Sequence, residues 1–164
     1  MNTAKAAAVS DVAVIGAGTT LSFEDPENEG EYLLLEGART IGATGEQGEF
    51  VETTPISSTT RTYIPGLKTP PDKEIVGNDI PGDTNQETFL ELARSNSTVN
   101  MKVEYSNGRL GDFVIALAGF QINDATGSDA LQWTVYGKQS GDVAWTQAVM
   151  GVSVSPSTAD LEVA

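Results

Sequence analysis

Short stretches in which apolar and polar residues alternate recur along the chain, and this two-residue period is typical of β-strands with one buried face. The pattern is found in residues 19–23, 32–35, 49–53, 73–77, 101–105, 112–122 and 131–136. So many short strands, separated by turn residues, predict a mainly β fold built as a sandwich or a barrel.

One segment has the period of a helix instead. Thr84 and Glu87 stand three positions apart and suit a capping box, in which the Thr84 hydroxyl accepts the Glu87 amide and Glu87 reaches back. The apolar stripe that follows consists of Phe89, Leu90, Leu92 and Ala93. Asn96 is a suitable stop, because asparagine tolerates a left-handed backbone. We therefore predict one flanking helix over about residues 84–95, covering one face of the sheet.

The strongest hairpin signal is Asn107-Gly108, because both residue types tolerate a positive φ. The strand before it, Met101–Tyr105, alternates cleanly between apolar and polar residues. The return strand, Asp112–Ile122, contains a continuous apolar stretch, which predicts burial on both faces over part of its length.

A long polar gap interrupts the strand pattern over residues 53–72. Compact domains seldom contain a connection longer than about 12–15 residues without structure of its own unless it is functional or disordered. The gap nevertheless contains residues typical of interface anchors, namely Arg61, Tyr63, Ile64 and Leu67. We predict a long loop that binds a partner through these four side chains.

The composition excludes several classes of function. A chain of 164 residues is expected to form one domain. It contains no cysteine and no histidine, which removes thiolate chemistry, disulfides, and the commonest general base and metal ligand. Carboxylate chemistry stays open, but no pair of carboxylates has the local context of an acid and a base. We predict no catalytic residue, no metal site and no cofactor.

The formal net charge of −14 argues against binding to the phosphate backbone of nucleic acids and against an anionic membrane surface. No apolar run approaches the roughly 18 residues that a membrane-spanning helix needs. The N-terminal residues make a poor signal peptide, so we expect a product of the cytoplasm.

Two short motifs suggest a ligand but fit an ordinary turn better. Residues Gly16–Thr20 resemble a phosphate loop, yet they lack the third glycine of the dinucleotide motif and the Gly-Lys ending of the nucleotide motif. The acidic cluster Glu24–Glu29 lacks the spacing of a calcium loop and is interrupted by Pro26. We interpret both segments as turns.

Several segments, taken in order, resemble the tail tube proteins (major tail proteins) of long non-contractile-tailed, lambda-type bacteriophages. The segments are Val14–Leu21, Thr53-Thr54 with Thr60–Leu67, Lys73–Asn78, Pro81–Gln86, Asn107-Gly108, Gly119-Phe120 and Ser140-Gly141. The resemblance spans roughly residues 12–142. It departs at residues 150–164, which look like the opening strand of the immunoglobulin-like domain that the lambda type carries in full.

The resemblance implies a tail tube β-sandwich with one flanking helix and no catalytic activity. It implies that six copies form a ring, that rings stack into a hollow tube, and that DNA passes through without specific binding. The implied partners are further copies of the chain and the tape measure, tail tip and tail terminator proteins, with no membrane. The implied location is the tail of the virion, after synthesis in the host cytoplasm.

This interpretation gives the acidic charge a purpose, because a negative wall repels phosphates and keeps DNA from sticking. Our candidate lumen-facing residues are Glu49, Glu52, Glu74 and Glu104. We expect a tail tube domain at residues 12–147, flanked by arms at residues 1–11 and 148–164. The arms and the loop at residues 53–72 would be mobile in the free subunit and would become ordered on assembly.

Two other classes of function stay open. The chain could be a carbohydrate- or protein-binding β-sandwich of a virion, such as a decoration or fibre module, which would be a monomer or a trimer. It could also be a carboxylate-dependent enzyme, which would need a concave acidic pocket and a carboxyl group with a raised pKa.

Overall fold

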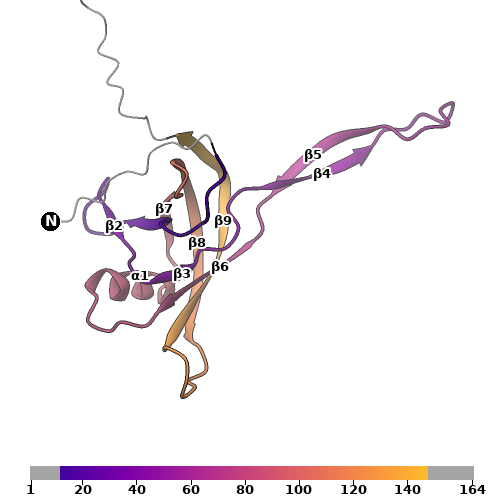
Figure 1. Cartoon of the computed structure of the whole chain (residues 1–164). Coiled ribbons are helices and arrows are strands. Elements are labelled where there is room, and N and C mark those ends of the chain that lie inside the picture. Colours follow the sequence, from indigo (N-terminus) through magenta and orange to yellow (C-terminus); the bar gives the residue numbers. More distant parts are fainter. Residues whose placement is uncertain (1–11, 148–164) are drawn as a thin grey trace, which may run out of the picture.

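The computed structural model describes residues 12–147 as one curled antiparallel sheet, one helix and a separate two-stranded hairpin (Figure 1). The strands of the sheet are, in spatial order, β2 (Tyr32–Leu34), β1 (Thr20–Glu24), β7 (Thr98–Glu104), β8 (Arg109–Ile122), β9 (Gln132–Gln147), β6 (Asp72–Asn78) and β3 (Ala38–Thr40). The hairpin consists of β4 (Gln47–Glu52) and β5 (Tyr63–Thr69), and the helix α1 is Thr84–Arg94. The predicted mainly β fold with one helix is confirmed.

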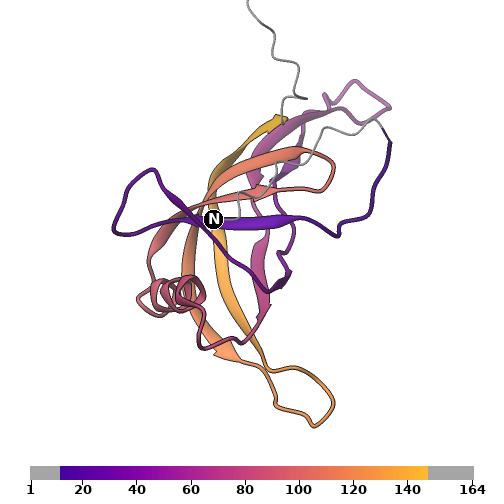
Figure 2. The same cartoon turned by 60° about the vertical axis from the view of Figure 1, so that its left-hand side comes forward.

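The sheet curls until its two edges come close together. β2 and β3 lie at opposite edges, yet only Leu35, Glu36 and Gly37 connect them. From Leu34 to Ala38 a connection of this length spans at most about 14 Å. Hydrogen bonds from Leu35 N to Leu21 O (2.8 Å) and from Asn78 N to Gly37 O (2.9 Å) attach it to both edges. The result is the half-barrel that Figure 2 shows.

One face of the sheet and helix α1 enclose the core. Phe89 of α1 packs against Phe23 of β1 and Trp133 of β9, with ring centroids 5.2 and 5.9 Å away. Gly77 of β6 leaves room for the Trp133 ring, because a Cβ there would lie 2.4 Å from it. The indole N–H of Trp133 donates to Asn78 O at 3.2 Å, so the ring is both packed and hydrogen-bonded.

The N-terminal cap of the helix differs from the prediction. Asp83 is the N-cap: its Oδ1 accepts the Asn85 amide at 3.1 Å, and its carbonyl accepts the Glu87 amide at 3.1 Å. The predicted capping box on Thr84 is therefore wrong, because Thr84 is already the first helical residue. The predicted stop at Asn96 is confirmed by its φ of +55°.

The hairpin between β7 and β8 forms where it is predicted, with Gly108 N donating to Tyr105 O at 3.0 Å and a φ of +87° at Gly108. The predicted burial of β8 on both faces is wrong. Its buried side chains are Phe113, Ile115 and Leu117, whereas Ala116 and Ala118 are exposed. The small residues Ala116 and Ala118 extend the apolar run on the second face, where Val114 is only half-buried.

The segment at residues 53–72 is not the long irregular loop that the polar gap predicts. Residues 63–69 form β5, which pairs with β4 so that Val51 lies opposite Ile64 and Glu52 opposite Tyr63. Only the tip at residues 53–62 and the pair Pro70-Pro71 lie outside strands. A proline and a glycine inside β5 argue against a strand in the sequence, but this strand belongs to an isolated hairpin, where they are tolerated.

Candidate assembly surfaces

β4 and β5 form a hairpin, here called the arm (residues 47–69), which projects from the rest of the molecule, the body (Figure 1). At its tip, Thr53 N donates to Thr62 O at 2.8 Å and Thr62 N donates to Thr54 Oγ1 at 3.0 Å. The two strands make extensive contacts only with each other among the described elements. The arm is therefore held by its own hydrogen bonds and by its root in the body.

The arm exposes large apolar side chains on both of its faces. They are at least half exposed, and they are Phe50, Val51, Ile56, Tyr63, Ile64 and Leu67. The strand register places Phe50 with Pro65 on one face and Val51 with Ile64 on the other. A two-stranded hairpin is at best marginally stable alone in water, and contiguous exposed apolar surface marks an interaction site. The arm thus exposes apolar side chains on two faces that no described element of the chain covers extensively.

The four predicted anchors all lie on the arm. Tyr63, Ile64 and Leu67 belong to β5, and Arg61 lies near the tip with its Nε 3.9 Å from Glu52 Oε1. What these side chains bind stays a prediction. The sequence reasoning missed Phe50, Val51 and Ile56. The first two belong to a predicted strand, and alternation alone does not reveal that the strand has no core beneath it.

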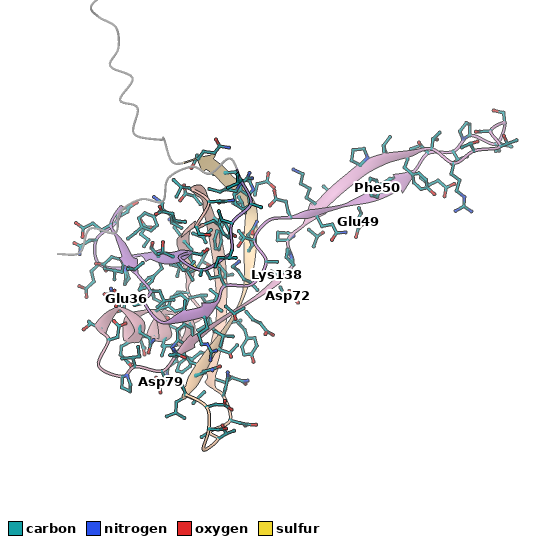
Figure 3. All side chains as sticks on the ribbon, in the orientation of Figure 1. Glu36, Glu49, Phe50, Asp72, Asp79 and Lys138 are labelled. Carbon is teal, nitrogen blue, oxygen red and sulfur yellow. The ribbon has the colours of Figure 1, made fainter. Side chains whose placement is uncertain are left out.

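The second surface is the face of the sheet opposite the core. Glu74 of β6 lies on it because Lys73 and Ile75, its neighbours in the strand, point into the core. Glu104 of β7 lies on it for the same reason, since the preceding Val103 is buried. The other two predicted lumen acids, Glu49 and Glu52, lie on the arm instead, and Figure 3 shows Glu49 there beside Phe50. The structure therefore divides the four predicted lumen residues between two surfaces.

The same sheet face carries further charges that the sequence reasoning did not single out. The ammonium groups on it are paired: Lys138 Nζ lies 3.2 Å from Asp72 Oδ1, and Lys102 Nζ lies 3.8 Å from Asp112 Oδ1. Glu24, Glu74 and Glu104 also lie on this face, so these strands bring five carboxylates to it against two ammonium groups, and the face is net negative.

The acidic segment between β1 and β2 forms the turn that we expect. Asp25 Oδ1 accepts the Glu27 amide at 2.9 Å, and Glu24 Oε1 accepts the Gly30 amide at 3.0 Å. Hydrogen bonds from Gly30 and then from Asn100 stabilise the charged carboxylate of Glu24 and hold its pKa below its ordinary value. Within residues 12–147 no group of possible ligands is placed to hold a metal ion.

Comparison with known families identifies the family of the chain that carries these surfaces. A model of the phage tail tube protein family matches residues 30–148, which include the arm, the helix and most of the sheet. The chain belongs to this family. Tail tube proteins are structural components of the virion tail and are not a family of enzymes. No helix of the described residues is long and apolar enough to cross a membrane.

Solved tail and injection assemblies share the fold. A subunit of the SPP1 phage tail tube has a TM-score of 0.62 at 12% identity, over 82% of this chain and 80% of that one. A subunit of the sixfold-symmetrised anti-feeding prophage baseplate has a TM-score of 0.67 at 9% identity, over 85% and 99%. A subunit of the tail of an empty gene transfer agent particle, determined with C6 symmetry, has a TM-score of 0.66 at 13% identity, over 82% and 99%. No curated protein sequence matches the chain.

Proposed function

We propose that copies of this chain form hexameric rings, and that the rings stack into the hollow tail tube through which phage DNA is delivered. The observation that carries the proposal is the arm, a hairpin with apolar side chains on both faces and little contact with its own body. For a member of a tube-forming family, the partner that covers such an arm is another copy of the chain. The sixfold symmetry of two similar assemblies supports the ring size.

In this proposal the contact runs from the arm of one copy to a different surface of the next. Contacts of this head-to-tail kind repeat, and they generate closed rings or open filaments. Arg61, Tyr63, Ile64 and Leu67 are the inter-subunit anchors. Strand pairing already holds most of the arm in the free subunit, so the ordering on docking that we predict falls on its tip at residues 53–62, and that cost restrains free subunits from polymerising. The two terminal segments that the sequence predicts to be arms, residues 1–11 and 148–164, lie outside the described residues.

The net negative sheet face is the proposed wall of the lumen. It carries Glu74 and Glu104, and its paired ammonium groups at Lys102 and Lys138 are already occupied by carboxylates. Such a wall repels DNA phosphates and gains nothing from counterion release, so the DNA slides past. Glu49 and Glu52 remain lumen candidates only if the docked arm brings them to the inner wall.

The ends of the tube require other proteins. Among the similar solved structures are a tube terminator of an extracellular contractile injection system and a tube-terminating cap of the anti-feeding prophage. By analogy we propose that this chain contacts a tail terminator, a tail tip protein and a tape measure protein in the virion.

Negative-stain electron microscopy of the concentrated protein tests the proposal. We expect rings with sixfold symmetry or stacked tubes, because the arm cannot cover itself. A protein that stays a monomer or a trimer at every concentration, with its arm free, would refute the proposed rings and tubes and would favour a decoration or fibre module instead.

A further inference from the structure

Both legs of the arm leave the body at one place, where buried polar side chains meet. The first leg, β4, follows the strap, a segment without strand structure at residues 41–46. The second leg, β5, ends at Thr69 and leads through Pro70-Pro71 into β6. Lys73, the second residue of β6, reaches across to the strap, so it connects the roots of the two legs.

Lys73 is bound to the strap through all of its donors. Its Nζ donates to Thr44 Oγ1 at 2.6 Å, to Ala43 O at 2.9 Å and to Gly42 O at 3.5 Å. These acceptors match the three N–H groups of an ammonium ion. The residue is only 1% exposed, its Nζ lies 4.9 Å from the centre of the Phe113 ring, and it belongs to none of the ion pairs found within residues 12–147. Lysine is rarely buried in this way without a carboxylate.

Gln139 of β9 holds the other end of the strap. Its Oε1 accepts the Gly45 amide at 3.3 Å, and its Nε2 donates to Glu46 Oε2 at 3.2 Å. Gly42 lies so close to β6 that a Cβ on it would be 3.0 Å from Glu74 O, and its φ is +77°. The strap is therefore attached along its length to the core face of β6 and β9.

We propose that Lys73 and Gln139 form a clasp that fixes the direction of the arm, so that a free subunit presents the arm in the pose in which a second copy receives it. The use of that pose rests on the proposed self-assembly, whereas the clasp is a property of the single chain. On the opposite sheet face, Asp72 and Lys138 pair at the same root (Figure 3). Lys73 acts as a positioning residue, because it contacts the strap and not the partner.

The length of the arm makes its root important. Strands rise about 3.3 Å per residue, so the tip lies roughly 30 Å from the strap, and a turn of about 10° at the root moves the tip by about 5 Å. A shift of that size moves an apolar anchor away from the surface of the copy that receives it. An arm that is held in place before docking loses less freedom on binding, which favours assembly.

The clasp has a pH dependence whose sign follows from its burial. Burial lowers the pKa of Lys73 from 10.5 to about 8. The charged groups on the surrounding elements are Glu46 on the strap, Asp72 and Glu74 on β6, Asp112 on β8 and Lys138 on β9. Glu46 is bound to Gln139, and the four others lie on the opposite sheet face. A strap that opens exposes Lys73 and restores its pKa, so the open state binds more protons and opening becomes harder as pH rises above about 8.

The test measures the direction of the arm in the free subunit. The chain has no cysteine, so Ser57→Cys at the tip and Glu91→Cys on α1 accept spin labels at those sites alone. We expect one narrow distance distribution in the parent, and broad distributions after Lys73→Met or Thr44→Val, each of which removes a clasp contact. Lys68→Met, an exposed lysine of the arm itself, is the matched control and keeps the narrow distribution.

Amide exchange gives a second, local readout. Peptides over residues 42–49 should exchange about tenfold faster in Lys73→Met, while the peptides of β7 and β8 keep their rates. After correction for intrinsic rates, strap protection in the parent should rise between about pH 7 and about pH 9.5, and Lys73→Met should lack that rise. Unchanged distances and exchange in both Lys73→Met and Thr44→Val would overturn the clasp, and Thr44→Val decides if Lys73→Met does not fold. A parent protein that forms no tubes would refute self-assembly without touching this result.

Discussion

At the scale of single residues, the space available in the core explains why glycines stand inside strands, and hydrogen bonding explains why a lysine is buried. Gly77 and Gly137 stand in strands because neighbouring side chains occupy the volume of a Cβ: the Trp133 ring lies 2.4 Å from that position at Gly77, and Ile115 lies 2.7 Å from it at Gly137. Lys73 can be buried for a different reason, because its ammonium group donates its hydrogen bonds to acceptors on the strap. Each case leads to a measurable consequence.

Gly77→Ala should destabilise the fold by about 1–3 kcal/mol, because the added methyl group overpacks the core against Trp133. Urea unfolding followed by tryptophan fluorescence measures the change. Gly127→Ala is the control, since a Cβ there meets nothing within 4 Å and should leave stability within about 0.5 kcal/mol. Equal midpoints for the two variants would contradict the packing described here.

Lys73 should make stability depend on pH in an unusual direction. Its pKa is about 8 in the fold and 10.5 when the side chain is fully exposed, so the unfolded chain binds more protons between these values. The free energy of unfolding should therefore rise with pH across this window, by on the order of 3 kcal/mol at most, and Lys73→Met should lack this contribution. Urea unfolding of both proteins at a series of pH values checks it, and parallel pH curves would contradict it.

At the scale of elements, local patterns in the sequence predict most of the sheet but only one strand of the arm. The sequence predicts β1, β2, β4, β6, β7, β8 and the first half of β9, and it does not predict the short strand β3. It misses β5, where Pro65 and Gly66 interrupt the period, and it misses the far half of β9, where Gly141 with a φ of +84° marks an irregularity in the pairing with β8. The anchors are visible as large side chains in a polar segment. The clasp is not, because Lys73 and the strap lie about 30 positions apart.

The helix cap gives a direct test at this scale. Asp83→Ala should cost about 1 kcal/mol, because the Asn85 amide loses its acceptor. Thr84→Ala, the substitution that the predicted capping box would make costly, should change stability by less than about 0.5 kcal/mol. Thermal unfolding of the two variants settles the assignment, and the reverse order of effects would restore the box on Thr84.

The two faces of the arm should both be needed for assembly. Phe50→Ser with Tyr63→Ser alters one face, and Val51→Ser with Ile64→Ser alters the other. We expect each double variant to lose tubes in negative stain while its thermal unfolding stays close to that of the parent, because the arm contributes little to the core. Thr59→Ser at the tip is the control and should assemble normally. Normal tubes in either double variant would show that the face concerned stays exposed.

At the scale of the whole molecule, the curled sheet separates two functions. Its core face receives the helix, and its opposite face presents Glu74, Glu104 and paired charges as a net negative surface. The arm projects away from both (Figure 1). In the proposed tube, one subunit therefore supplies both the wall of the lumen and the connector to the next copy.

Charge reversal should make the wall bind DNA. Tubes carrying Glu74→Lys and Glu104→Lys should retain short duplex DNA at low salt and protect it from nuclease, with binding lost as salt rises. The control places the same charge change at Glu87 and Glu91 on α1, on the other side of the sheet. DNA bound to those tubes should stay open to nuclease. Equal protection of DNA by the two variants would show that Glu74 and Glu104 do not line the lumen.

The central claim is that this chain builds a tube by covering its arm with neighbouring copies. A cryo-electron microscopy map of the assembled protein tests it most directly. We predict stacked sixfold rings in which Phe50 and Ile64 are buried between copies, and in which Glu74 and Glu104 line the channel. A tube with free arms, or a channel lined by the helix side of the sheet, would contradict the account.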